Sequence, residues 1–230
     1  MTAPQYASDW FASAVTEHDK VKKAKVLPNG EVRIKRTDQL SALTVAPLKN
    51  PRIDKGVVKE VLTLGTPSII LLVPKRGHYD WDARELAETN GSSVLTVREL
   101  YTFLGEDDPR LFVDKNVGYA RRLLSQHSKV LQLDMICESS FRLKRTPPLR
   151  PLIVAVEYEY EFTEESVVKA LERHPDCDVI LNSNPNGKST AAALALAAQT
   201  ETPIFLLKHL MGALNYDGAS FRNYQPHNEH

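Results

Sequence analysis

The feature that most constrains this chain is an internal repeat in its sequence. The segment Arg33–Thr37, which reads Arg-Ile-Lys-Arg-Thr, is matched 109 positions later by Arg142–Thr146, which reads Arg-Leu-Lys-Arg-Thr. One inserted residue near residues 50–54 moves the offset to 110, and the match then continues from Val57 to Leu104. The copies share roughly 20 identities over about 90 positions, where chance at typical residue frequencies gives about 6. This similarity predicts two tandem domains and a tail: a first repeat over 1–109, a second over 110–218 and a flexible segment over 219–230.

Length and composition agree with two small globular domains. The chain has 230 residues, of which 42% are hydrophobic and 25% charged. It therefore has room for two domains of roughly 100 to 120 residues each. Lysine plus arginine equals aspartate plus glutamate, 29 against 29. Because there is no overall charge, any attraction to nucleic acid must come from a local basic patch.

The cysteine count and the distribution of apolar residues point to a cytoplasmic protein without membrane contact. Cys137 and Cys177 are the two cysteines, too few for a disulfide framework, and neither has a His-Asp pair near it in sequence that would make a thiol nucleophile. No apolar run approaches the roughly 20 residues that a membrane helix requires. The N-terminal segment lacks the basic and apolar regions of a signal peptide.

Each half predicts the same series of secondary-structure elements. Apolar spacing indicates opening helices over 8–18 and 116–127, followed by three short strands. In the first half the Asn29-Gly30 pair predicts a tight hairpin turn between the first two of these strands. A helix, a strand, a helix, a strand and a closing helix follow, so the fold class is α/β with a mixed central sheet flanked by helices, and its later strands are expected to be parallel.

This order of elements resembles the Mrr-type branch of the restriction-endonuclease-like PD-(D/E)XK superfamily. In the second half the resemblance covers nearly the whole repeat and is carried mainly by residues 178–194, where a strand ending in small polar residues leads into a helix. It implies two tandem nuclease-like repeats that form a pseudo-dimer, of bacterial or phage origin and used in restriction or defence. It also implies DNA as the partner and hydrolysis of the phosphodiester backbone with Mg²⁺.

The resemblance implies a single active site, in the second half. The family places an Asp on its second strand and an acid-x-Lys pair on its third, and the matching residues are Asp134, Glu157 and Glu159, with Glu159 standing where the family has Lys. In this scheme Asp134 and Glu157 hold the metal and Glu159 orients or deprotonates the attacking water. When the two halves are aligned, Lys25 stands at the position of Asp134, and the third strand of the first half has no acidic residue. The site of the first half is therefore expected to be eroded.

A structural alternative exists for the same acidic residues. If the strand predicted over 152–160 continues to its end, Glu157, Glu159 and Glu161 form its solvent face, and Tyr158 and Tyr160 point inward. In that case the acids are the exposed positions of an amphipathic strand and carry no chemistry.

A basic strand is common to both halves. Arg33 and Lys35, like Arg142 and Lys144, alternate with apolar residues and therefore share the outward face of a strand. Two such faces related by a pseudo-twofold axis would straddle a DNA duplex. Alternatively, these cations protect an edge strand from aggregation. The residues expected to contact nucleic acid are Arg33, Lys35, Arg36, Arg142, Lys144, Arg145 and Lys188, and a first-half cluster of Lys20, Lys22, Lys23 and Lys25 adds charge.

The segment 182–190 has some features of a phosphate-binding loop. It follows a strand, ends in Gly187-Lys188-Ser189 and opens a helix, but Asn182 occupies the position of the first glycine. Either its backbone amides meet a phosphate of the nucleic acid, or it is a plain turn capped by Ser189.

The sequence therefore predicts a nucleic-acid-binding protein with a duplicated nuclease-like fold, with one metal-dependent endonuclease site or none. The alternative from another class is a non-enzymatic interaction module, whose duplicated surfaces bind a protein partner or a second copy of the chain.

Overall fold

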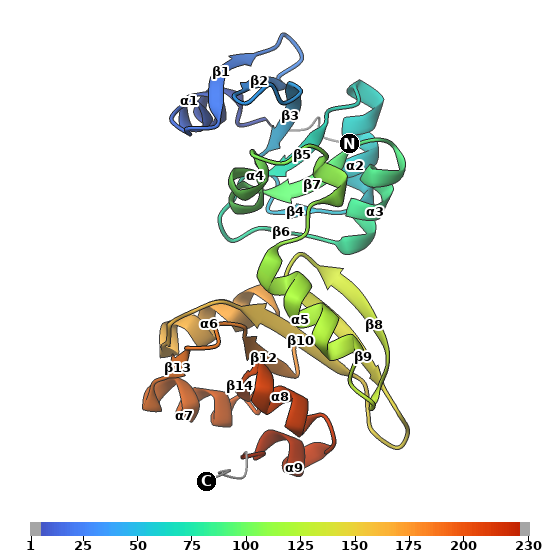
Figure 1. Cartoon of the computed structure of the whole chain (residues 1–230), viewed down its shortest axis with the longest axis vertical. Helices are drawn as coiled ribbons and strands as arrows, with labels where there is room; N and C mark the ends of the chain where they lie inside the picture. The colour runs from blue at the N-terminus through green and yellow to red at the C-terminus, as the bar shows by residue number, and fades with distance from the viewer. Residues whose placement is uncertain (1–5, 226–230) are drawn as a thin grey trace. The chain divides into compact units, whose positions relative to one another are not determined.

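The computed structural model describes residues 6–225 of the chain and contains two compact units, Met1–Phe112 and Val113–His230 (Figure 1). Both units are mixed α/β, and each contains a five-stranded sheet. The boundary follows Phe112 because this side chain is buried against Phe103 within unit 1.

Unit 1 builds its sheet from a three-stranded antiparallel meander and two further parallel strands. The strand order is β1-β2-β3-β5-β7, with β3, β5 and β7 parallel. Its elements are α1 (Ser8–Thr16), β1 (Val21–Val26), β2 (Val32–Arg36), β3 (Leu43–Leu48), β4 (Arg52–Ile53), α2 (Lys55–Leu64), β5 (Ile69–Leu72), β6 (His78–Tyr79), α3 (Trp81–Thr89), β7 (Ser93–Thr96), α4 (Val97–Phe103) and the 3-10 helix η1 (Pro109–Leu111).

Unit 2 has the same strand order and the same strand directions. Its sheet runs β8-β9-β10-β12-β14, antiparallel through β10 and parallel from there on. Its elements are α5 (Lys115–Ser125), β8 (Val130–Cys137), β9 (Ser140–Arg145), β10 (Leu152–Glu157), β11 (Glu161–Phe162), α6 (Glu164–Arg173), β12 (Val179–Asn182), β13 (Lys188–Ser189), α7 (Ala191–Gln199), β14 (Ile204–Leu206), α8 (Leu207–Ala213) and α9 (Gly218–Arg222).

Local sequence explains several of these elements. Gly30 has a φ of 85° in the turn between β1 and β2, a value that glycine adopts without steric cost. β5, with the sequence Ile-Ile-Leu-Leu, is buried along its whole length, as expected for a parallel strand with helices on both faces. Thr96 and Glu99 form a capping box that starts α4.

The helices cover the two faces of each sheet unequally. In unit 1, α1 and α4 pack with residues of β1, β2, β3, β5 and β7 on one face. On the other face, the buried cluster that holds α2 and α3 contains residues of β3, β5 and β7 and none from β1 or β2 among the described residues. The clusters of unit 2 repeat this arrangement, with none from β8 or β9 around α6 and α7 within the same described range. The outer face of each two-stranded ribbon, β1–β2 and β8–β9, therefore lies outside the helical layer.

Two expectations about the second half are wrong. The strand predicted over 152–160 ends at Glu157, and Tyr158 and Tyr160 are 44% and 65% exposed instead of pointing inward. The predicted flexible tail begins with α9, whose Phe221 is fully buried against Phe205. Phe221 is part of the core cluster of unit 2 and Tyr224 packs against it, and residues 226–230 lie outside the described part of the chain.

In each unit, a buried arginine at the end of the second strand donates hydrogen bonds to backbone carbonyls later in the chain. Arg36 donates through Nε to the Ser41 carbonyl at 2.9 Å and through Nη1 to the carbonyls of Leu104, at 3.3 Å, and Glu106. Each arginine is only 2% exposed, which lowers the pKa of both guanidinium groups from the usual value. Arg145 makes the corresponding contacts in unit 2, with Arg150 O at 2.8 Å, Leu214 O at 3.3 Å, Tyr216 O at 2.7 Å and Asp217 Oδ1 at 3.1 Å.

We expect Arg145→Lys to destabilise unit 2 by roughly 2–3 kcal/mol, because lysine has no planar group that reaches several carbonyls at once, and buried acceptors left unpaired are costly. Urea denaturation would measure the loss. Arg142→Lys, on the exposed face of the same strand, is the matched control and should change stability by less than about 0.5 kcal/mol. Equal effects of the two substitutions would contradict this role for Arg145.

Candidate nucleic-acid interface

The outer face of the β1–β2 ribbon carries four cations in two cross-strand pairs. Lys23 on β1 is opposite Lys35 on β2, and Lys25 is opposite Arg33. All four are exposed, while the alternate residue Ile34 is fully buried. A bulge at Lys22 adds a fifth cation to the same strand. The spacing of two residues along each strand places the four paired cations on one face.

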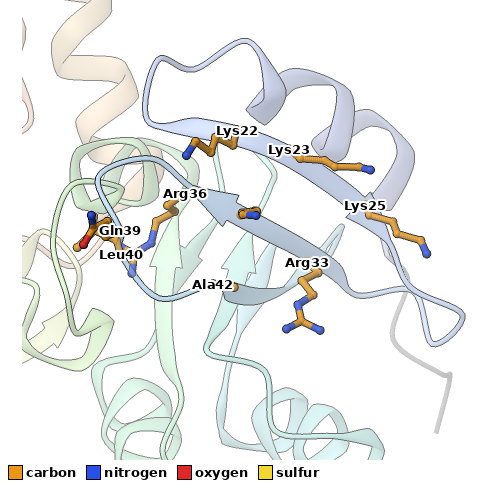
Figure 2. A pocket seen from close by; sticks show the side chains of 9 residues that line it. Lys22, Lys23, Lys25, Arg33, Arg36, Gln39, Leu40 and Ala42 are labelled. Carbon is orange, nitrogen blue, oxygen red and sulfur yellow. The ribbon is translucent and has the colours of Figure 1, made fainter.

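These cations line a hollow of about 630 Å³. Figure 2 shows the lysines spread along β1, with Arg33 extending from β2 and Arg36 turned toward the loop that holds Gln39 and Leu40. No hydrogen bond or ion pair found within residues 6–225 engages the side chains of Lys22, Lys23, Lys25, Arg33 or Lys35. The hollow is lined by Lys22, Lys23, Lys25, Arg33, Lys35, Arg36, Gln39, Leu40 and Ala42.

Both cross-strand pairs place like charges directly opposite each other. Opposite charges in such positions stabilise a sheet by roughly 0.2–1 kcal/mol, and like charges destabilise it. The Lys23/Lys35 and Lys25/Arg33 pairs therefore oppose folding of the ribbon. Violations of a local folding rule are expected mainly at functional sites.

Arg36 lines the hollow, but its guanidinium group is hydrogen-bonded to the protein's own backbone. Its Nη2 is buried and has no hydrogen-bond partner in the described structure. In unit 2 the corresponding nitrogen of Arg145 donates to Asp217. Burial of Arg36 and Arg145 argues against the predicted nucleic-acid contact for either, because a phosphate cannot reach them without displacing the loops they hold together.

The ribbon of unit 2 carries a different set of charges. Gln132 is opposite Lys144 and Asp134 is opposite Arg142. The side-chain amide of Gln132 donates to both carboxylate oxygens of Asp134, at 2.9 and 3.0 Å. The four side chains are exposed, so this face holds two cations and one anion where the unit 1 face holds four cations.

The three carboxylates predicted to form a metal site are not brought together. β9 lies between β8 and β10, and Asp134 is level with Ile153, four residues before Glu157. With about 4.8 Å between strands and 3.3 Å per residue, the two Cα atoms are roughly 16 Å apart, too far for both carboxylates to reach one cation at 2.0–2.6 Å. No group of three metal-binding side chains occurs in the part of the chain that the structure describes.

The Glu157 carboxylate has a structural partner, and the backbone of Glu159 is held in a loop. Glu157 accepts a hydrogen bond from Arg173 at 2.9 Å. The backbone of Glu159 exchanges two hydrogen bonds with the buried side chain of Asn182, from Glu159 N at 3.2 Å and to Glu159 O at 2.9 Å. These residues do not fit the Mg²⁺ that the family resemblance implied.

The loop over 182–188 also uses its polar groups internally. The backbone amides of Asn184 and Asn186 donate to side chains of the same loop, and that of Gly187 donates to Asn184 O. Lys188 donates its backbone amide to Tyr160 O, and its side chain is exposed. The loop is a turn whose amides are already satisfied, and Thr190 caps α7 in place of Ser189.

A cluster of His174, Cys137 and Ser139 forms from residues far apart in the sequence, and no local pattern indicates it. His174 lies 3.8 Å from Cys137 Sγ through Nδ1 and 3.1 Å from Ser139 Oγ through Nε2. Burial raises the pKa of Cys137 to about 12, and the nearby Glu138 charge acts in the same direction. The thiol therefore stays protonated at neutral pH and is a poor nucleophile.

Comparison of the chain with protein-family models, with curated proteins and with solved structures gives no match. Within residues 6–225, none of the helices has the length and apolar character needed to cross a bilayer.

We expect Lys25→Asp to stabilise unit 1, because it turns a like-charge pair with Arg33 into the opposite-charge pair that Asp134 and Arg142 form in unit 2. The gain should be roughly 0.2–1 kcal/mol and should shrink at high salt. Urea midpoints at low and high ionic strength would measure it. Lys75→Asp, an exposed change in a loop, should give no such gain, and a lower midpoint for Lys25→Asp at low salt would refute the interpretation.

Proposed function

We propose that the outer face of the β1–β2 ribbon binds the phosphate backbone of duplex DNA without reading its sequence. The observation that carries the proposal is the array of Lys23, Lys25, Arg33 and Lys35, all exposed and without an acidic partner in the described structure. Four cations that repel one another destabilise an uncovered face. Binding of a polyanion offsets this cost, because it supplies the negative charge that the face lacks.

The spacing of the array suits a phosphate backbone. Residues two apart on a strand are about 6.6–6.8 Å apart, so the array spreads its charges over several phosphates and does not concentrate them on one. Neutralising phosphates releases condensed counterions, which makes such binding strongly salt-dependent.

Duplex is favoured over single-stranded nucleic acid by the lining of the hollow. Single-strand binders stack bases on aromatic side chains, and none of the lining residues is aromatic. The backbone of a duplex presents phosphates without exposing bases, so a purely cationic surface is sufficient to bind it.

The nuclease-like ancestry is part of the proposal, as is duplication of one ancestral unit. Equal strand order in the two sheets, corresponding buried arginines and a bulge at the same place in β1 and β8 support the duplication. The order of a helix, a three-strand meander and alternating helices and strands is the one that the resemblance implies. The separation of Asp134 from Glu157 favours binding over metal-dependent cleavage as the function of this chain.

We expect the protein to bind short duplex DNA. A plot of the logarithm of the binding constant against the logarithm of the salt concentration should have a slope of about −3.6, from about −0.9 for each of four neutralised phosphates. Replacing Lys23, Lys25, Arg33 and Lys35 together by alanine should abolish binding, and Arg33→Ala alone should make the slope shallower by about 0.9. Fluorescence anisotropy across a salt series would measure both.

Lys59→Ala with Lys75→Ala, two exposed lysines outside the ribbon, is the control and should leave the slope unchanged. Binding that survives the fourfold change, or tighter binding to single strands, would overturn the proposal. Loss of an acidic protein partner in the fourfold variant, with no DNA binding by the wild type, would instead assign the face to the interaction-module function.

A further inference from the structure

The two ribbons have the same backbone pairing and differ in which side chains oppose the shared cations. Arg33 and Arg142 occupy corresponding positions on β2 and β9, as do Lys35 and Lys144. On the edge strand, unit 1 places lysines opposite this pair, and unit 2 places Gln132 and Asp134 there. The faces differ in these edge-strand residues and at the bulge, where unit 1 has Lys22 and unit 2 has Leu131.

We infer that Asp134, held by Gln132, prevents the β8–β9 ribbon from binding nucleic acid, so that each chain holds one duplex through unit 1 alone. This inference rests on the proposed function of the β1–β2 face. Asp134, for which the family resemblance implied a metal site, thereby takes the role of a specificity-determining residue.

The position of Asp134 explains this effect. Its carboxylate lies on the exposed face opposite Arg142, so a phosphate approaching Arg142 meets a negative charge within the same cross-strand pair. The hydrogen bonds from Gln132 hold the carboxylate toward the Lys144 end of the ribbon. Asp134 thus supplies from within the chain the counter-charge that the unit 1 ribbon lacks.

The remaining uses of Asp134 are excluded by its surroundings. It is exposed, so it contributes no buried contact to the core of unit 2. Glu157 is four residues further along the sheet and two strands away, so these two carboxylates cannot share a cation. An opposite-charge pair stabilises the ribbon, so the unit 2 face has the charges that folding favours and the unit 1 face has the charges that a polyanion favours.

The test exchanges the edge-strand residues. Gln132→Lys with Asp134→Lys should give the unit 2 ribbon four cations, and introduced into the fourfold alanine variant it should restore salt-dependent binding with a slope within about one unit of the wild-type value. In the otherwise unchanged protein the same two substitutions should raise the stoichiometry from one to two short duplexes per chain. Analytical ultracentrifugation with a labelled duplex of about one helical turn would count them.

The matched control is Gln126→Lys with Asp176→Lys, which adds the same charge at exposed positions of unit 2 outside the ribbon. It should neither restore binding nor change the stoichiometry. Asp134→Asn is a second variant that removes the repulsion without adding like charges, and it should allow weak second-site binding even if the double lysine variant fails to fold.

The outcomes separate this inference from the proposed function. Wild-type binding of one duplex, with no second site in either Asp134 variant, would overturn the inference and leave the proposed function intact. Two duplexes bound by the wild type would also overturn it, because Asp134 would then not block the face. Absence of wild-type binding would remove the proposed function itself.

Discussion

The buried arginine at the end of the second strand is the interaction on which the candidate interface depends. Arg36 joins β2 to the segment after α4, and Arg145 joins β9 to the segment after α8, each through several backbone carbonyls. Because side chains alternate along a strand, an arginine pointing inward at position 36 places Lys35 and Arg33 outward. Together with the buried Val32 and Ile34, the anchor therefore fixes the face of β2 on which its charges lie.

The two ribbons show how one backbone arrangement serves different balances between stability and binding. In unit 1, four cations repel one another across the ladder, and among the described residues the buried cluster around α2 and α3 contains none of β1 or β2. In unit 2 an aspartate opposes one of the arginines. The physical difference is a few charges on an exposed face, which changes the core of neither unit.

The acidic residues illustrate why a motif in sequence does not define a site. Spacing of two residues places Glu157 and Glu159 on one face only if the strand continues, and β10 ends at Glu157. The loop that follows is held by the buried Asn182 side chain. Asp134 lies two strands away, and no local pattern in the sequence indicates that distance.

Much of the architecture was predictable from local patterns, because alternation, helical spacing and turn chemistry act over a few residues. The α/β class, the hairpin at Asn29-Gly30 and the outward direction of Arg33 and Lys35 are of this kind. Tertiary structure alone buried Arg36 against the segment after α4 and placed the carboxylates of Asp134 and Glu157 two strands apart. These outcomes depend on strand order and on contacts between residues far apart in the chain. The energy of each such contact is set by neighbouring side chains that the local sequence does not specify.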